Sequence, residues 1–195
     1  LTFHHRNIMR GTTFISQAST FLIPAFTLVY LTERKNWATY LNLNKTPQLN
    51  NISLAVIILL ASMPLTQFIF WINKQIPLPE LFNKWENLSE TAISGLITME
   101  SPIELILSLI VMAVIPALGE EFVFRGILQK NLEKIFKNGH AAVWSAAFIF
   151  SAFHFQFMGF LPRFFLGILL GYLFLWTRNL WIPLIALFIY NGIQV

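Results

Sequence analysis

The sequence predicts an all-α, polytopic membrane protein: a bundle of about six transmembrane helices with an amphipathic helix at the membrane interface. Of its 195 residues, 56% are hydrophobic and only 11% are charged, whereas soluble domains have about 25% charged residues. So few charges cannot cover a surface that faces water, so most of this surface is expected to face lipid. The apolar residues also gather in long runs, and about 20 of them in a helix cross a bilayer.

Six apolar runs are expected to cross the membrane, at residues 12–31, 52–72, 102–118, 141–157, 161–176 and 180–195. The last three are short for complete spans, which favours a compact bundle with some helix ends buried in protein. Between the second and third runs, Leu81, Trp85 and Leu88 recur at helical spacing among charged residues. This segment is therefore predicted to be an amphipathic helix lying on the membrane surface.

The chain is expected to form one integrated bundle that divides at about residue 100. Residues 1–100 supply the N-terminal transmembrane helices and the interfacial segment, and residues 101–195 supply the core that carries the polar motifs described below. The chain has no cysteine, which excludes disulfides and thiolate metal sites. The net charge of +4 is spread over loops, which suits membrane lipids as partners and does not indicate nucleic acid. Because the sequence stops at Val195 inside an apolar run, its C-terminus is expected to be truncated.

The motif GEEFVFRG, at residues 119–126, places three ionisable side chains in an apolar environment. Glu121 and Arg125 are four residues apart on one helix face, so they are expected to form an ion pair. Glu120 lies about 100° further round the helix and is free to face another partner. These charges could instead lie at the water boundary, where they would have no special role. Ionisable residues inside a membrane are, however, candidates for function by default.

Two further polar side chains lie in separate apolar runs. His154 follows Phe150 by four residues, so both are expected to project from one helix face. Asn191 lies in the last run. A histidine among aromatic residues is more often a satisfied core residue than a base, and a buried asparagine often only bridges helices. Glu120, His154 and Asn191 can meet only in the interior of the bundle, where a carboxylate and an imidazole can activate water and an amide can stabilise an oxyanion.

The order and spacing of these residues resemble the CPBP family of intramembrane proteases, which includes the CAAX prenyl endopeptidases and the bacteriocin-processing or abortive-infection proteins. The resemblance covers roughly residues 100–195, and HFQFMGFLPRFFLGILLGYLF is similar to bacterial members. It implies a multi-pass protein of the bacterial cytoplasmic membrane that cleaves a membrane protein or peptide. Within that family pattern, Glu120 and His154 would activate water and Asn191 would stabilise the oxyanion. The residues that would shape the site are Glu121, Arg125 and Phe150.

One position departs from the family pattern, which has a second histidine four residues before the asparagine. This chain has Leu187 there. The change removes a candidate metal ligand or oxyanion donor, and Glu120 and His154 remain as candidate ligands for a divalent metal such as zinc. Two hypotheses follow: a peptidase with a weakened, metal-independent site, or a catalytically impaired relative that acts as a binding or scaffold protein. A proton-linked transporter is a third, but no paired repeats with broken helices support it.

Overall fold

The computed structural model describes residues 2–77 and 80–195, apart from the side chains of residues 80–85 and 87. Every regular element in this part of the chain is helical, which confirms the predicted fold class. Three segments, η1, η3 and η4, are π-helical, and η2 is a 3-10 helix. In chain order the elements are α1 (Phe3–Gln17), η1 (Ala18–Leu22), α2 (Ile23–Glu33), η2 (Arg34–Asn36), α3 (Trp37–Tyr40), α4 (Leu49–Lys74), α5 (Glu80–Ile97), α6 (Pro102–Leu109), η3 (Ile110–Val114), α7 (Ile115–Glu120), η4 (Glu121–Gln129), α8 (Lys130–Phe136), α9 (Gly139–Ala152), α10 (Phe160–Thr177) and α11 (Trp181–Gly192).

Four helical runs in the described residues are long and apolar enough to cross a membrane: Phe3–Tyr40, Leu49–Lys74, Pro102–Phe136 and Phe160–Thr177. The other two predicted runs correspond to α9 and α11, which are shorter apolar helices. Three of the predicted runs had wrong boundaries. The run at 12–31 belongs to a longer helical run, Phe3–Tyr40. The run at 102–118 continues as helix to Phe136, because π-helical turns carry the chain past Pro116 without a break. The run at 141–157 stops being helical at Ala152.

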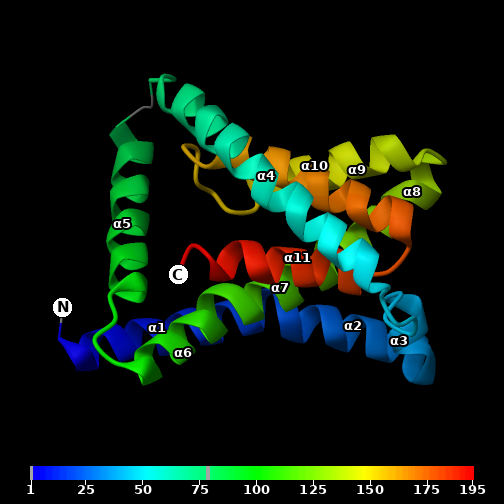
Figure 1. Cartoon of the computed structure of the whole chain (residues 1–195), viewed down its shortest axis with the longest axis horizontal. Coiled ribbons are helices and arrows are strands. Elements are labelled where there is room, and N and C mark those ends of the chain that lie inside the picture. Colours follow the sequence, from blue (N-terminus) through cyan, green and yellow to red (C-terminus); the bar gives the residue numbers. More distant parts are fainter. Residues whose placement is uncertain (1, 78–79) are drawn as a thin grey trace.

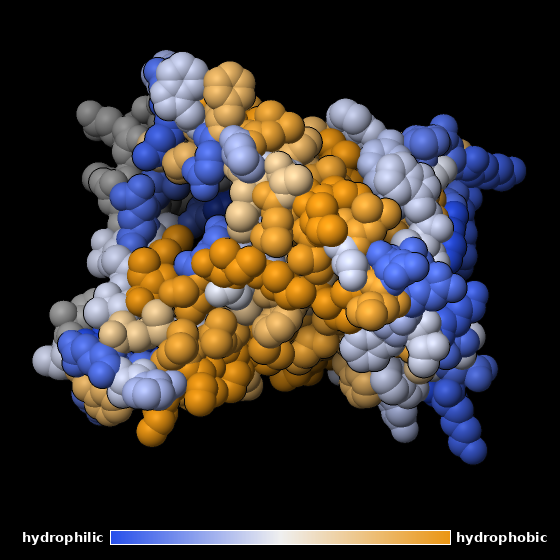
Figure 2. Space-filling view, viewed as in Figure 1, coloured by the Kyte–Doolittle hydropathy of each residue, from blue (hydrophilic) through white to orange (hydrophobic). Residues whose placement is uncertain are grey.

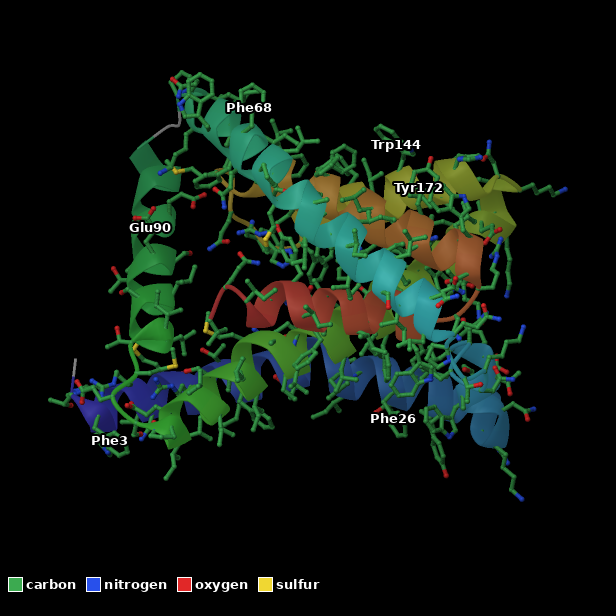
Figure 3. All side chains as sticks on the ribbon, viewed as in Figure 1. Phe3, Phe26, Phe68, Glu90, Trp144 and Tyr172 are labelled. Carbon is green, nitrogen blue, oxygen red and sulfur yellow. The ribbon has the colours of Figure 1, made fainter. Side chains whose placement is uncertain are left out.

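The long helices run side by side, with α11 in the middle of the bundle (Figure 1). It packs against α4, α10, η3 and α7. One apolar core joins Leu59 of α4, Leu170 of α10 and Leu187 of α11. On the face shown in Figure 2, a hydrophobic band crosses the centre of the molecule, and hydrophilic residues gather at both ends. Figure 3 shows Phe26 and Phe68 pointing out of the bundle, where they are 42% and 55% exposed. This surface suits a bilayer.

Helix α5 crosses one end of the bundle instead of running along it (Figure 1). That placement agrees with the predicted interfacial helix, because a helix parallel to the membrane plane lies across the ends of spanning helices. Of the predicted apolar face, Leu88 is exposed, whereas the side chains of Leu81 and Trp85 lie outside the described part of the chain.

A buried cluster of polar side chains connects the helices at this end of the bundle. On α1, Arg6 donates from Nε and Arg10 from Nη1 to the same Glu104 oxygen on α6, at 2.9 and 2.7 Å. Arg10 also donates to Ser108 Oγ at 2.9 Å and to the carbonyl of Thr98, just after α5, at 2.8 Å. The side chains of Arg6, Arg10 and Glu104 are no more than 3% exposed. The cluster therefore ties α1 and α6 to the end of α5.

Replacing Glu104 with Gln should clearly lower the free energy of unfolding, because Arg6 and Arg10 lose the carboxylate that they share. The matched control is Glu133→Gln, since Glu133 pairs with the exposed Arg178 at 2.5 Å and such surface pairs contribute about 0–1 kcal/mol. Denaturant unfolding in detergent micelles measures both changes. Equal losses for the two variants would contradict the structural role of the cluster.

Candidate active site

The two glutamates of GEEFVFRG lie in different environments. Glu120 is the last residue of α7 and lines a cavity, and Glu121 is the first residue of η4 and is fully buried. The predicted ion pair between Glu121 and Arg125 is present. Arg125 also donates to the carbonyl of Gly167 at 3.2 Å and lies over the ring of Phe150 at 4.9 Å. Glu121 and Arg125 therefore fix this helix and leave Glu120 to face the cavity.

One turn further along η4, a second side chain also donates a hydrogen bond to a backbone carbonyl of α10. Gln129 donates from Nε2 to the carbonyl of Gly171 at 3.0 Å, four residues beyond the contact of Arg125 with Gly167. Lipid offers no competing hydrogen bonds, so both contacts are kept within the protein. They set how η4 is rotated against α10.

His154 lies in the turn that follows α9, so the prediction that it projects from a helix face was wrong. The four-residue spacing still places it near Phe150, because His154 Nδ1 hydrogen-bonds the Phe150 carbonyl at 2.8 Å. A carbonyl only accepts, so Nδ1 carries the proton and Nε2 of the neutral ring is an acceptor. Nε2 lies 3.8 Å from Glu120 Oε1, which is too far for a direct hydrogen bond.

Hydrogen bonds to three helices, α4, α5 and α9, hold the loop that carries His154. Asn73 of α4 donates to the Phe157 carbonyl at 2.8 Å, and Ser151 of α9 donates to the Phe160 carbonyl at 2.5 Å. Glu86 of α5 accepts a hydrogen bond from the Met158 backbone at 3.0 Å. The position of the imidazole therefore depends on the packing of α4 and α5 as well as on α9.

A cavity of about 370 Å³ brings the candidate catalytic side chains together. Glu120, His154 and Asn191 all line it, and Phe150 contributes to its wall. Glu121 and Arg125 are not among the lining residues, in keeping with their place inside the protein. Leu187 also lines the cavity and is 1% exposed. At this position the site therefore presents an apolar surface to any reacting group.

Glu120 also lines a second cavity, of about 530 Å³. Gln17 of α1 and Ile93 of α5 are among its lining residues. Four residues line both cavities: Glu120, Arg163, Asn191 and Gln194. Figure 2 shows a polar hollow at this end of the molecule, beside α5. Glu120 thus borders two cavities, and α5 forms part of the wall of the second.

Sequence reasoning missed five polar residues that line the first cavity: Thr66, Gln67, Arg163, Tyr190 and Gln194. Arg163 had a visible signal, since it is the only charge within the apolar run at 161–176. Tyr190 and Gln194 gave a weaker one, because they lie one residue before and three residues after Asn191. That Tyr190 and Gln194 both line the cavity follows only from the packing of α11, which the sequence does not show.

The donor set does not fit a catalytic zinc ion. Such sites usually have three protein ligands, and the described residues hold no group of three histidine, cysteine, aspartate or glutamate side chains able to bind a metal. Glu120 and His154 supply two.

The two adjacent glutamates should differ in their effect on stability. Glu121→Gln should lower the free energy of unfolding by about 3–5 kcal/mol, because it leaves Arg125 buried without its carboxylate. Glu120→Gln should unfold close to the wild type, because no ion pair within hydrogen-bonding distance is lost. Denaturant unfolding of both variants in the same detergent tests the contrast, and the reverse order would contradict the assigned environments.

Comparison with known proteins finds a family match for the C-terminal half. Residues 102–193 match the family described as "Type II CAAX prenyl endopeptidase Rce1-like", and this range contains Glu120, His154 and Asn191. The uncharacterized protein YpbD of Bacillus subtilis (strain 168) is 33% identical over 89 residues, which cover 44% of this chain and 42% of YpbD. The chain thus matches less than half the length of that relative. No solved structure matches the chain.

The family match agrees with the four long apolar helices, and together they identify an integral membrane protein. Residues 102–193 are therefore similar to the Rce1-like family of type II CAAX prenyl endopeptidases, and this match supports a CAAX-type intramembrane protease fold for that part of the chain.

Proposed function

We propose that this protein is an intramembrane endopeptidase that hydrolyses a peptide bond of a membrane-associated protein or peptide. The observation that carries the proposal is the separation of 3.8 Å between Glu120 Oε1 and His154 Nε2 at the wall of a cavity. Both atoms are acceptors in the neutral-imidazole state, so a water molecule that donates to each would satisfy them. The family match makes peptide hydrolysis the reaction to test first.

In the proposed reaction, the Glu120 carboxylate takes a proton from this water, and the water oxygen attacks the carbonyl carbon of the scissile amide. The carbonyl π electrons move onto the oxygen and form a tetrahedral oxyanion, to which the Asn191 amide donates. When the intermediate collapses, the C–N bond breaks and the leaving nitrogen takes up the proton that Glu120 removed from the water. The products are a carboxylic acid and an amine.

The remaining candidate residues act by position. The buried pair of Glu121 and Arg125 holds the helix that carries Glu120, and Phe150 contacts Arg125 with its ring and His154 with its carbonyl. In this proposal, residues 101–195 form the catalytic core, and residues 1–100 supply the wall around α5. The proposed location is the bacterial cytoplasmic membrane, with lipids and a membrane protein or peptide as partners.

A second candidate function is favoured by one observation. Leu187 is buried in the cavity wall directly among the candidate catalytic residues and offers neither a metal ligand nor a hydrogen-bond donor. A relative that has lost catalysis would still keep the cavity and could hold a membrane peptide as a binding or scaffold protein. The two functions differ in one outcome: only the peptidase releases two fragments from a bound peptide.

Glu120→Gln should abolish cleavage, with a loss of at least about 10²–10⁴-fold, because an amide cannot take the proton from water. The assay uses purified protein in lipid vesicles with a defined library of fluorophore-labelled, membrane-spanning peptides, and mass spectrometry identifies the fragments. Glu133→Gln, which changes an exposed pair far from the cavity, is the active control. Equal cleavage by wild type and Glu120→Gln would refute the proposal, and peptide binding by the wild type without cleavage would favour the scaffold.

Removing metal ions should leave the cleavage rate unchanged, since the described residues supply only two of the three protein ligands that zinc usually has. The measurement compares the wild-type rate before and after treatment with EDTA and 1,10-phenanthroline, in the same vesicles. A loss of activity that zinc restores would show that a metal takes part.

A further inference from the structure

Arg163, in the first turns of α10, is the one cation that lines either of the two cavities among the described residues. It shares both cavities with Glu120 and Asn191. Neither the ion-pair network of the bundle nor the reaction proposed above uses it. A charged group inside a membrane protein needs a reason to be there, because apolar alternatives are available at no electrostatic cost.

The guanidinium group is seated in a defined place. It donates to the Gln156 carbonyl at 3.4 Å and to the Gln156 side chain. A Cβ atom at Gly159 would lie 2.5 Å from the Arg163 Cζ atom, so the guanidinium fills the space that a side chain at position 159 would take. Gly159 lines the first cavity as well. The group is thus held at the cavity wall by neutral partners.

Its charge is not neutralised by direct contact with a carboxylate. The buried arginines Arg6, Arg10 and Arg125 each form an ion pair within 4 Å. Arg163 forms none within the described part of the chain, although Glu120 and Glu86 attract it at longer range. A guanidinium has five N–H groups, and the contacts with Gln156 leave others available. This arrangement favours an anion, or a developing negative charge, inside the cavity.

From these contacts we infer that Arg163 is a catalytic residue that stabilises the oxyanion, an inference that rests on the proposed peptidase function. Asn191 is a neutral donor and Leu187 provides none, whereas Arg163 is the one lysine or arginine among the described residues that line the cavity. A hydrogen bond from a charged donor is roughly twice as strong as one between neutral groups. Because the charge on the carbonyl oxygen develops only in the transition state, the contact raises kcat and leaves KM almost unchanged.

Arg163→Gln tests the inference in the vesicle assay. The expected result is a fall of about 10²–10³ in kcat with KM and the unfolding midpoint close to wild type. Arg163→Lys, which keeps the charge but not the fork of donors, should recover part of kcat. Gly159→Ala is a second probe, because the added methyl group displaces the guanidinium while the arginine remains. It should lower kcat in the same direction.

The outcomes separate the inference from the function on which it rests. No cleavage by wild type overturns both. Cleavage by wild type with an unchanged kcat in Arg163→Gln overturns the inference alone. A rise in KM at constant kcat also overturns it, because that pattern means that Arg163 binds a carboxylate of the substrate and does not act on the oxyanion. If Arg163→Gln does not fold, an unchanged kcat in Gly159→Ala serves as the contrary result.

Discussion

The pair of contacts between η4 and α10 sets the geometry of the whole site. Arg125 and Gln129 reach the carbonyls of Gly167 and Gly171, so two successive turns of one helix meet two successive turns of the other. In lipid these groups have no water as an alternative partner, and rotation of η4 would leave both side chains unsatisfied. With this rotation fixed, Glu120 faces the cavity, because its direction differs from that of Glu121 by about 100°.

The same glycines bring α9 and α10 close together, which places the second half of the site. A Cβ atom at Gly167 would lie 3.0 Å from the Ala147 side chain, and one at Gly171 would lie 2.9 Å from Val143. Small residues four apart are the usual means by which membrane helices approach closely. His154 follows α9 and Arg163 begins α10, so this tight packing fixes their positions together. Gly167 and Gly171 therefore serve two purposes: their carbonyls accept hydrogen bonds from η4, and their lack of a side chain lets α9 approach α10 closely.

Local sequence patterns correctly predicted the features that depend on the residues of a single helix. The all-α class followed from composition, and the pairing of Glu121 with Arg125 followed from their spacing of four residues. Features that depend on contacts between distant segments were not predictable. Arg6 and Glu104 are 98 positions apart, and nothing near either residue shows that they meet. The end of α9 at Ala152 was missed for a similar reason, because hydrophobicity continues through the loop, whereas tertiary hydrogen bonds to that loop decide where the helix stops.

The arginines of this bundle fall into two groups: buried arginines that form ion pairs between or within helices, and Arg163, which lines a cavity. Burying an arginine is tolerable only with a carboxylate and enough hydrogen bonds, and each fully buried arginine has them. Arg163 is the exception, because it lines the same cavities as Glu120 but does not form an ion pair with it. If they paired directly, each would neutralise the other and neither could act on a third molecule. In the proposed mechanism, their separation would keep a base and a cation available around the space where a peptide bond would lie, while the buried ion pairs elsewhere hold the helices together.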